Sequence, residues 1–239
     1  MLNFLGIGAQ KSGTTWLYEM LRHHKTVLFP AGKEVHFWDA NLDKGIAWYD
    51  SLFAGEENGK VKGEITPAYA ILPPNIISDI YHHYPHLRLI YIIRNPIERA
   101  WSSALMALER AEMMIEEASD QWFMDHFMSH GSLLRGDYED CIRRWRSVYP
   151  SEQLLILRYE DIANNPNPLL SKCFSHIRVD TNVAEYISYE KMKEQIFAGP
   201  LYPIKPILIK FLSEIYKPKI LSLSEYLKTD FSEWLLVNS

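Results

Sequence analysis

Eight residues near the N-terminus have the composition of a loop that could bind a phosphate group. They read Gly8-Ala9-Gln10-Lys11-Ser12-Gly13-Thr14-Thr15 and separate an apolar run from a segment with helical spacing. The glycines let the backbone approach a ligand closely, and the amide groups at a helix start attract an anion. Lys11 adds a positive charge, and the hydroxyl groups add hydrogen-bond donors. An ordinary strand–helix connection with capping hydroxyls would have the same composition, so both interpretations remain open here.

The order of the residues distinguishes this loop from the phosphate loop of nucleoside triphosphatases. In the pattern GxxxxGK[ST] the lysine follows the second glycine, whereas Lys11 precedes Gly13. The strongest later strand is followed by Arg94 rather than by an aspartate that would hold Mg²⁺. A guanidinium group can bind a phosphate through two parallel hydrogen bonds, although Arg94 could instead pair with Glu98 or Glu64. The pattern favours phosphate binding by basic side chains, and a nucleotide kinase with a diverged loop is the alternative.

A second segment with potential catalytic groups carries a carboxylate and an imidazole two residues apart. The segment reads Lys33-Glu34-Val35-His36-Phe37-Trp38-Asp39. In an extended chain, side chains two residues apart point to the same side, so Glu34 and His36 could face one cleft. Either group can accept a proton, and Asp39 could orient the imidazole. The alternative is a surface ion pair between Lys33 and Glu34, with His36 packed beside Phe37.

Strands and helices alternate along the chain, which is typical of a parallel sheet covered by helices on both faces. Apolar runs predict strands at 2–8, 62–65, 87–93 and 154–157. Helical spacing predicts a helix after the first loop and further helices near 45–52, 74–83, 96–110, 119–129, 137–148, 167–177 and 206–215. Ligands of such sheets bind beyond the C-terminal ends of the strands, which is where the loops after residues 8 and 93 should lie.

Composition places the chain among ordinary globular proteins and excludes several classes of function. Its 239 residues suit one domain, expected to span 1–239. A net charge of −5 argues against a general nucleic-acid binder. Two isolated cysteines, Cys141 and Cys173, predict neither a disulfide scaffold nor a zinc site. No apolar run is long enough to span a membrane and the N-terminus has no signal-peptide pattern, so a cytoplasmic protein is expected.

Several motifs, in this order, resemble those of the sulfotransferases that use 3′-phosphoadenosine 5′-phosphosulfate (PAPS). Gly8 to Leu17 resembles their 5′-phosphosulfate loop, and Ile90 to Ser102 resembles their 3′-phosphate motif. The stretches 33–39 and 64–69 are similar to the heparan sulfate sulfotransferase branch and its bacterial relatives. Arg135-Gly136-Asp137-Tyr138 and Leu154 to Asp161 match later landmarks. The resemblance implies an α/β, P-loop-like three-layer fold with a central parallel sheet flanked by helices, and transfer from PAPS without a metal.

The resemblance also implies roles for individual residues. Lys11 would contact the 5′-phosphosulfate and stabilise the leaving oxygen, as expected for a loose transition state that depends on electrostatic stabilisation. Glu34 would be the general base, with His36 as the alternative. The remaining donor-binding residues would be Ser12, Gly13, Thr14, Thr15 and Trp16 at the 5′ end, Arg94 and Ser102 at the 3′-phosphate, and Tyr159 near the adenine. Trp16 and Tyr159 could equally be core residues.

The chain departs from the family where many relatives carry a late loop rich in glycine and lysine. The corresponding stretch, 191–203, retains only Lys191, Lys193 and Gly199 of that composition. The departure leaves an inactive nucleotide-binding homologue as a further alternative. The expected products are adenosine 3′,5′-bisphosphate and a sulfated small molecule, lipid or glycan. The sequence predicts no nucleic-acid partner, and it leaves open the acceptor and the oligomeric state.

Overall fold

The computed structural model describes residues 1–55, 59–194 and 202–236, and they form two compact units. The first unit comprises Met1–Ile93 and Arg143–Ile196, and the second comprises Arg94–Ile142 and Phe197–Ser239. The chain therefore passes from the first unit to the second directly after the strand that ends at Ile93.

The first unit contains a parallel sheet whose strands run in the order β2-β3-β1-β4-β5 among the described residues. The strands are β1 (Phe4–Gly8), β2 (Val27–Leu28), β3 (Val61–Ile65), β4 (Arg88–Ile93) and β5 (Leu154–Arg158). Gly6 of the central strand pairs with Ile65 on one side and with Ile90 on the other. Because all the strands are parallel, their C-terminal ends lie along one edge of the sheet.

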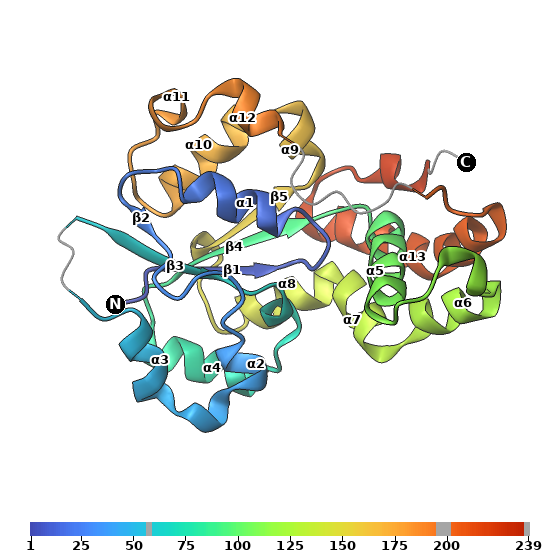
Figure 1. The fold of residues 1–239 in the computed structure, drawn as a ribbon, viewed down its shortest axis with the longest axis horizontal. Helices are drawn as coiled ribbons and strands as arrows, with labels where there is room; N and C mark the ends of the chain where they lie inside the picture. The colour runs from blue at the N-terminus through green and yellow to red at the C-terminus, as the bar shows by residue number, and fades with distance from the viewer. Residues whose placement is uncertain (56–58, 195–201, 237–239) are drawn as a thin grey trace. The chain divides into compact units, whose positions relative to one another are not determined.

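Helices cover both faces of this sheet, which gives the first unit three layers (Figure 1). One face carries α1 (Thr14–Leu21) with α9 (Glu160–Asn164), α10 (Pro166–His176), α11 (Val183–Tyr186) and α12 (Tyr189–Lys193). The other face carries α2 (Phe37–Ala40), α3 (Ile46–Leu52) and α4 (Pro74–His83), and the 3-10 turn η2 (Pro67–Ile71) joins β3 to α4. The expected α/β fold with a central parallel sheet flanked by helices is confirmed.

The core of the first unit lies between the sheet and the helices. Phe4 of β1, Leu17 of α1 and Phe174 of α10 are almost fully buried in one cluster. Burial of such a side chain contributes about 1.5–3 kcal/mol relative to exposure, so this layer fixes α1 against the sheet. The position of the loop that precedes α1 therefore follows from ordinary core packing.

The second unit is helical among its described residues. It contains α5 (Pro96–Arg110), α6 (Asp120–Met128), α7 (His130–Gly136), α13 (Pro206–Leu227) and the first part of α8 (Tyr138–Arg146). Helix α5 packs against α6, α7 and α13. The C-terminal turn η5 (Ser232–Leu235) packs on α13, and Asn95 at the start of α5 donates a hydrogen bond to the Trp234 carbonyl, 3.0 Å away.

Most predicted elements are confirmed to within one or two residues, but several short elements were missed and the end of the last helix was wrong. The missed elements are the strand β2 and the helices α2, α7, α9, α11 and α12, because two to seven residues carry too little periodicity to be recognised. The last helix was expected to end near 215, before Pro218, and it continues to Leu227. The buried residues Leu212, Tyr216 and Ile220 keep helical spacing through the proline, and their burial outweighs the roughly 3 kcal/mol that an internal proline costs.

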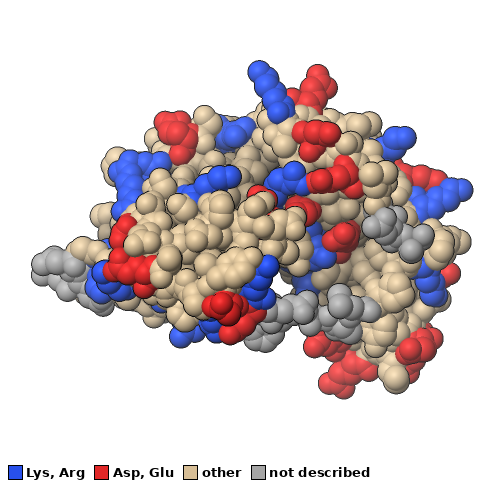
Figure 2. Space-filling view, turned by 90° about the horizontal axis from the view of Figure 1, so that it is seen from above, with Lys and Arg blue, Asp and Glu red and all other residues tan. Residues whose placement is uncertain are grey.

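Charged side chains of both signs are interspersed on the face drawn in Figure 2. This mixture agrees with the modest net charge of −5. Among the described residues, no helix is both long and apolar enough to cross a membrane.

Candidate active site

The loop between β1 and α1 has a backbone conformation that few residue types adopt. Lys11 and Gly13 both have left-handed φ values, of 67° and 81°. The Ser12 amide donates to the Ala9 carbonyl at 3.2 Å, and the Ala9 amide donates to the Ile92 carbonyl of β4 at 2.8 Å. The loop is thus closed on itself and tied to the end of the neighbouring strand.

Two features of this loop favour an anionic ligand. The first-turn amides of α1 have no carbonyl partner within the helix, as at any helix start, and they carry the positive end of its dipole. Ser12 is fully buried, and its Oγ has no hydrogen-bond partner among the described residues. A buried hydroxyl without a partner costs about 1–3 kcal/mol, which a bound phosphate oxygen would offset. The loop therefore fits a phosphate group on an observation independent of its sequence.

Two other residues expected at the donor lie beside this loop or directly after it. A Cβ on Gly13 would overlap Ile162 Cδ1 and would come within 3.1 Å of Tyr159 Cδ2, so the Tyr159 ring packs against the loop. Tyr159 follows β5, and its amide donates to the Ile93 carbonyl at 2.8 Å. Trp16 is buried, and its indole N–H donates to the Met192 carbonyl at 2.8 Å, so this side chain contributes to the core.

The segment that carries the proton-accepting groups is held at the end of β3. The Glu34 amide donates to the Ile65 carbonyl at 3.0 Å. The side-chain amide of Asn41 donates to the His36 carbonyl at 2.9 Å and to the Val35 carbonyl at 3.3 Å. Strand β3 neighbours β1, so this segment and the loop of Lys11 belong to the same edge of the sheet.

The backbone conformation that brings the Glu34 and His36 side chains together differs from the extended one considered above. An extended segment would bring them to one side, but Glu34 and His36 have left-handed φ values of 63° and 55°. His36 is the residue before α2, where the chain turns into the helix. The Glu34 Oε2 and His36 Nε2 atoms nevertheless lie 3.8 Å apart. The two side chains therefore lie close together although the segment is not extended, which was the condition under which the sequence brought them to one side.

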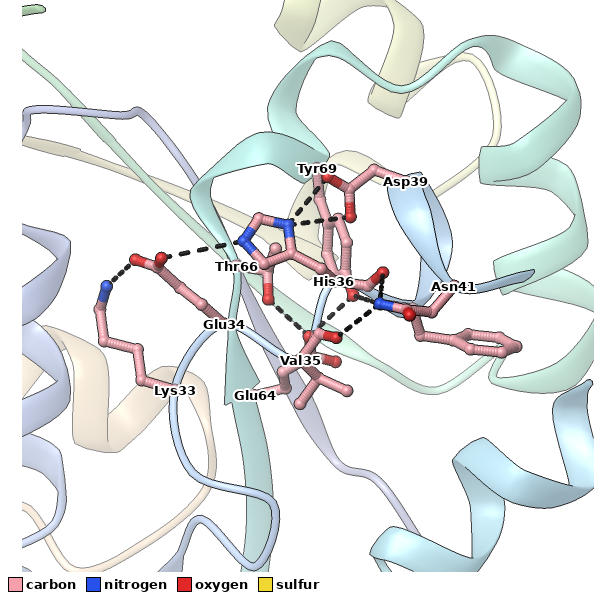
Figure 3. A network of polar contacts seen from close by, with 10 residues as sticks. Lys33, Glu34, Val35, His36, Asp39, Asn41, Glu64, Thr66 and Tyr69 are labelled. Atoms are coloured by element: carbon pink, nitrogen blue, oxygen red, sulfur yellow. Dashed lines mark hydrogen bonds and ion pairs between the residues drawn. The ribbon is translucent and has the colours of Figure 1, made fainter. Parts of the chain in front are cut away.

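Asp39 completes a cluster with these two side chains (Figure 3). His36 Nδ1 lies 2.9 Å from Asp39 Oδ2, and Lys33 forms an ion pair with Glu34. If Nδ1 carries the hydrogen toward Asp39, Nε2 of a neutral ring presents its lone pair on the side of Glu34. The Lys33–Glu34 pair, which was the alternative to a catalytic role, is present together with the contact between His36 and Asp39.

A buried carboxylate below this cluster was not assigned a role from the sequence. Glu64 is fully buried at the end of β3 and accepts hydrogen bonds from Thr66 Oγ1 at 2.6 Å, from Tyr69 at 2.8 Å and from Tyr49. Burial raises the pKa of the Glu64 carboxyl above its ordinary value, and the three hydroxyl donors lower it in part. A glutamate inside an otherwise buried strand is rare, and that rarity is the signal that could have identified it.

Arg94 and Ser102 belong to the second unit. The Arg94 guanidinium contacts Glu98 Oε2 through Nη2 at 2.9 Å and through Nε at 3.2 Å. Glu98 and Ser102 are four residues apart on α5, so both lie on the side of the helix that faces Arg94. The pairing with Glu98 was one of the two alternatives for Arg94. Glu64, the other alternative partner, is bonded to hydroxyl groups.

The late stretch expected to differ from its counterpart in related proteins is described only in part. Lys191 pairs with Glu194 at 2.6 Å, and Met192 is buried. Gly199 lies outside the described residues. In the parts of the chain that the structure describes, no group of three or more histidine, cysteine or acidic side chains is placed to hold a metal ion.

A family model and the curated relatives of this chain both name sulfotransferases. The family model described as a sulfotransferase domain matches residues 3–203. The human protein named heparan sulfate glucosamine 3-O-sulfotransferase 3B1 is 30% identical over 67% of this chain and 42% of its own length. The chain spans 63% or less of the length of the first curated relatives it matches.

Solved structures with the same fold include two sulfotransferases. A sulfotransferase from Alicyclobacillus acidocaldarius has a TM-score of 0.75 and 23% identity, and the match covers 98% of both chains. Mouse sulfotransferase SULT7A1, whose crystal structure is complexed with PAP, has a TM-score of 0.61 and 17% identity. That match covers 95% of this chain and 88% of the mouse chain.

Proposed function

Because the chain belongs to the sulfotransferase family, we propose that it transfers a sulfuryl group from PAPS to a hydroxyl or an amine of a sugar or small-molecule acceptor. The observation that carries this proposal is the loop of Lys11, which offers helix-start amides and the buried Ser12 hydroxyl to an anion. A proton-accepting cluster lies at the end of the adjacent strand. A donor site beside a base is what sulfuryl transfer needs.

In this proposal the 5′ end of the donor lies in the loop after β1. The amides of Gly13, Thr14 and Thr15 and the hydroxyl of Ser12 would bind the 5′-phosphosulfate. Trp16 would contribute its backbone amide only, since its indole N–H is already bonded. The Tyr159 ring, which packs beside Gly13, would contact the adenosine.

At the other end of the donor, Arg94 and Ser102 would bind the 3′-phosphate. In this structure the Arg94 guanidinium donates hydrogen bonds to the Glu98 carboxylate. A phosphate would have to share or displace that carboxylate, and its two negative charges favour the exchange. The mouse neighbour, which has the same fold, was crystallised as a complex with PAP, and this supports a nucleotide with phosphates at both positions.

The chemical step moves one proton and exchanges one sulfur–oxygen bond. The acceptor oxygen forms a bond to sulfur while the bond from sulfur to the 5′-phosphate oxygen breaks. Glu34 takes the acceptor proton, and His36, oriented by Asp39, is the alternative base. Lys11 stabilises the negative charge that develops on the leaving oxygen. The products are the sulfated acceptor and adenosine 3′,5′-bisphosphate.

The proposal also covers the extent of the domain, the class of acceptor and the location in the cell. Residues 1–239 would act as a single sulfotransferase domain, since the family match at 3–203 includes residues of both compact units. The acceptor would be a glycan, a lipid or another small molecule, in the cytoplasm. Fractionation of cells that express the full chain would test the location.

An acceptor screen tests the proposed activity. The protein is incubated with PAPS and a panel of sugars, lipids, phenols and amines, and mass spectrometry detects products that gain a sulfuryl group. We expect at least one acceptor to be sulfated with an equal amount of adenosine 3′,5′-bisphosphate. The Lys11→Ala variant should lose this product. Equal product formation by Lys11→Ala and wild type would contradict the role of the loop.

A further inference from the structure

The Tyr69 hydroxyl makes contacts that bear on the position of the proposed base. Tyr69 lies on η2, directly after β3, and its oxygen accepts hydrogen bonds from the Phe37 amide at 2.9 Å and from the Trp38 amide at 3.4 Å. These amides begin α2, where His36 offers no side-chain cap. Because the first amides of a helix have no partner within it, the Tyr69 oxygen takes the place of the missing cap.

Glu64 sets the direction of the Tyr69 hydroxyl. A phenol has one hydrogen to donate and two lone pairs to accept with. Tyr69 donates its hydrogen to Glu64 Oε1 at 2.8 Å, which leaves both lone pairs for the two amides of α2. Glu64 Oε1 can accept this hydrogen whether its own carboxyl is charged or neutral. The chain of contacts therefore runs from buried β3 to the start of α2 (Figure 3).

Glu34, His36 and helix α2 depend on contacts with the rest of the fold to keep their conformation. Glu34 and His36 are both in the left-handed conformation, which costs a non-glycine residue about 1–3 kcal/mol and persists only where surrounding contacts enforce it. Helix α2 has only four residues, so it cannot hold its own position by internal hydrogen bonds. His36 precedes α2 and Asp39 lies within it, and their contact depends on where the helix starts.

We propose that Tyr69, held by Glu64, is a positioning residue that fixes the start of α2 and thereby the orientation of His36 and Asp39. The inference rests on the proposed function for its catalytic meaning, while its structural part stands on the contacts alone. Tyr69 itself touches neither the loop of Lys11 nor the Glu34 carboxylate in the contacts described above.

Amide hydrogen exchange tests the structural part. In Tyr69→Phe the ring remains and the acceptor of the Phe37 and Trp38 amides is lost. One net hydrogen bond corresponds to about a fivefold to tenfold change in an opening equilibrium, so exchange of these amides should accelerate by that factor. Tyr49→Phe is the matched control, because it removes a donor to the same carboxylate and keeps the ring that stacks on Phe37, while the Phe37 and Trp38 amides bond to Tyr69 and not to Tyr49. Unchanged exchange in Tyr69→Phe, or equal acceleration in the control, would overturn the proposal.

A second measurement follows His36 directly and does not depend on turnover. The ring Hε1 resonance of His36, assigned by comparison with His36→Asn, should move in Tyr69→Phe and stay in place in Tyr49→Phe. An unmoved resonance in Tyr69→Phe would overturn the claim that the contact orients His36. If Tyr69→Phe does not fold, Glu64→Leu serves as the disrupting variant, and Glu64→Gln, which keeps an oxygen acceptor for Tyr69, should restore the resonance.

Turnover then separates this inference from the proposed function. With an acceptor from the screen, Tyr69→Phe should lower kcat by about tenfold to a hundredfold, as small misplacements of catalytic groups do. Binding of adenosine 3′,5′-bisphosphate should be unchanged. Fast exchange with unaltered kcat would overturn the catalytic part of the inference. If the wild type transfers no sulfuryl group from PAPS, the proposed function fails, and exchange together with the His36 resonance still decides the positioning role.

Discussion

Glu34 and His36 are close enough that a proton released by an acceptor could reach either of them. The carboxylate is paired with Lys33, and the imidazole is held by Asp39 through the other ring nitrogen. The His36 Nε2 atom, which is the ring nitrogen that does not contact Asp39, lies 3.8 Å from Glu34 Oε2. The two residues therefore have to be distinguished by substitution.

Glu34→Gln keeps the size of the side chain and removes its ability to accept a proton. We expect kcat to fall by about 10²–10⁴-fold, which is the usual contribution of a general base. Initial rates with PAPS and an identified acceptor measure the effect, and unchanged binding of adenosine 3′,5′-bisphosphate shows that the donor site survives. If Glu34→Gln retains near-normal kcat while His36→Ala loses it, His36 is the base.

Arg94→Ala tests the 3′-phosphate site through a comparison of two nucleotides. Adenosine 3′,5′-bisphosphate should bind about tenfold to a hundredfold more weakly, because hydrogen bonds to charged groups contribute about 1.5–3 kcal/mol. Adenosine 5′-monophosphate lacks the 3′-phosphate and should bind as it does to wild type. Calorimetric titration measures both. Glu98→Gln, which removes the negative charge beside the guanidinium, should retain binding of the bisphosphate. An equal loss of both nucleotides in Arg94→Ala would contradict the assignment.

The buried Glu64 predicts a pH dependence of stability. Its pKa is raised above the ordinary 4.5, first by desolvation and also by the charge of Asp39. The folded chain therefore binds the proton more tightly than the unfolded chain. The contribution of Glu64 to the free energy of unfolding is fully present below pH 4.5 and is lost as pH rises through the folded pKa.

Urea unfolding of wild type and Glu64→Gln over a pH series measures this contribution. The difference in unfolding free energy between them should become less favourable to wild type as pH rises above 4.5. Parallel curves over that window would show that Glu64 titrates as it does in the unfolded chain.

Among the elements, the first loop depends on the absence of a side chain at Gly13. Gly13→Ala would place a methyl group on Ile162 and would also strain a φ of 81°. We expect a loss of about 1–3 kcal/mol in the free energy of unfolding and a weaker affinity for adenosine 3′,5′-bisphosphate. Gly32→Ala is the matched control, because Gly32 also has a positive φ, 74°, but no atom lies within 4 Å of its Cβ position.

Nucleotide binding in the two variants distinguishes the loop from a general glycine effect. Gly32→Ala should lose stability because of its positive φ and should bind adenosine 3′,5′-bisphosphate as tightly as wild type does. If both variants bind adenosine 3′,5′-bisphosphate as wild type does, the packing of the loop against Ile162 and Tyr159 does not shape the donor site.

The predicted elements and the observed ones agree where the sequence pattern is long and local. Strand β4 and helices α4 and α5 were predicted within one residue, because each has continuous apolar character or helical spacing with a proline at its start. Helix α2 could not be predicted in this way. It is defined by the distant acceptor Tyr69 and by two left-handed residues, and neither is visible in local periodicity.

The candidate site shows the same division. The candidate phosphate-binding loop and the pairing of Glu34 with His36 could be proposed from the sequence because their residue types carry the chemistry. The Glu64 network was not, since it acts through hydroxyl groups from three separate positions, Tyr49, Thr66 and Tyr69, that only the fold brings together. The Arg94 contact with Glu98 was one of two open alternatives, and spacing along a helix alone could not choose between them.

At the scale of the whole molecule, the residues proposed to bind the donor are divided between the two compact units. Lys11, Ser12 and Tyr159 belong to the first unit, and Arg94 and Ser102 belong to the second. The central claim of the proposal is that the chain recognises an adenosine carrying phosphates at its 5′ and 3′ positions.

Nucleotide-dependent thermal unfolding of the full chain tests that claim most directly. The chain is melted with adenosine 3′,5′-bisphosphate in the presence of a chelator and, separately, with ATP and Mg²⁺. The bisphosphate at 100 times its Kd should stabilise the fold by about 2.7 kcal/mol, and ATP with Mg²⁺ should have little effect. Stabilisation by ATP with Mg²⁺ and none by the bisphosphate would contradict the proposed donor and favour a nucleotide kinase.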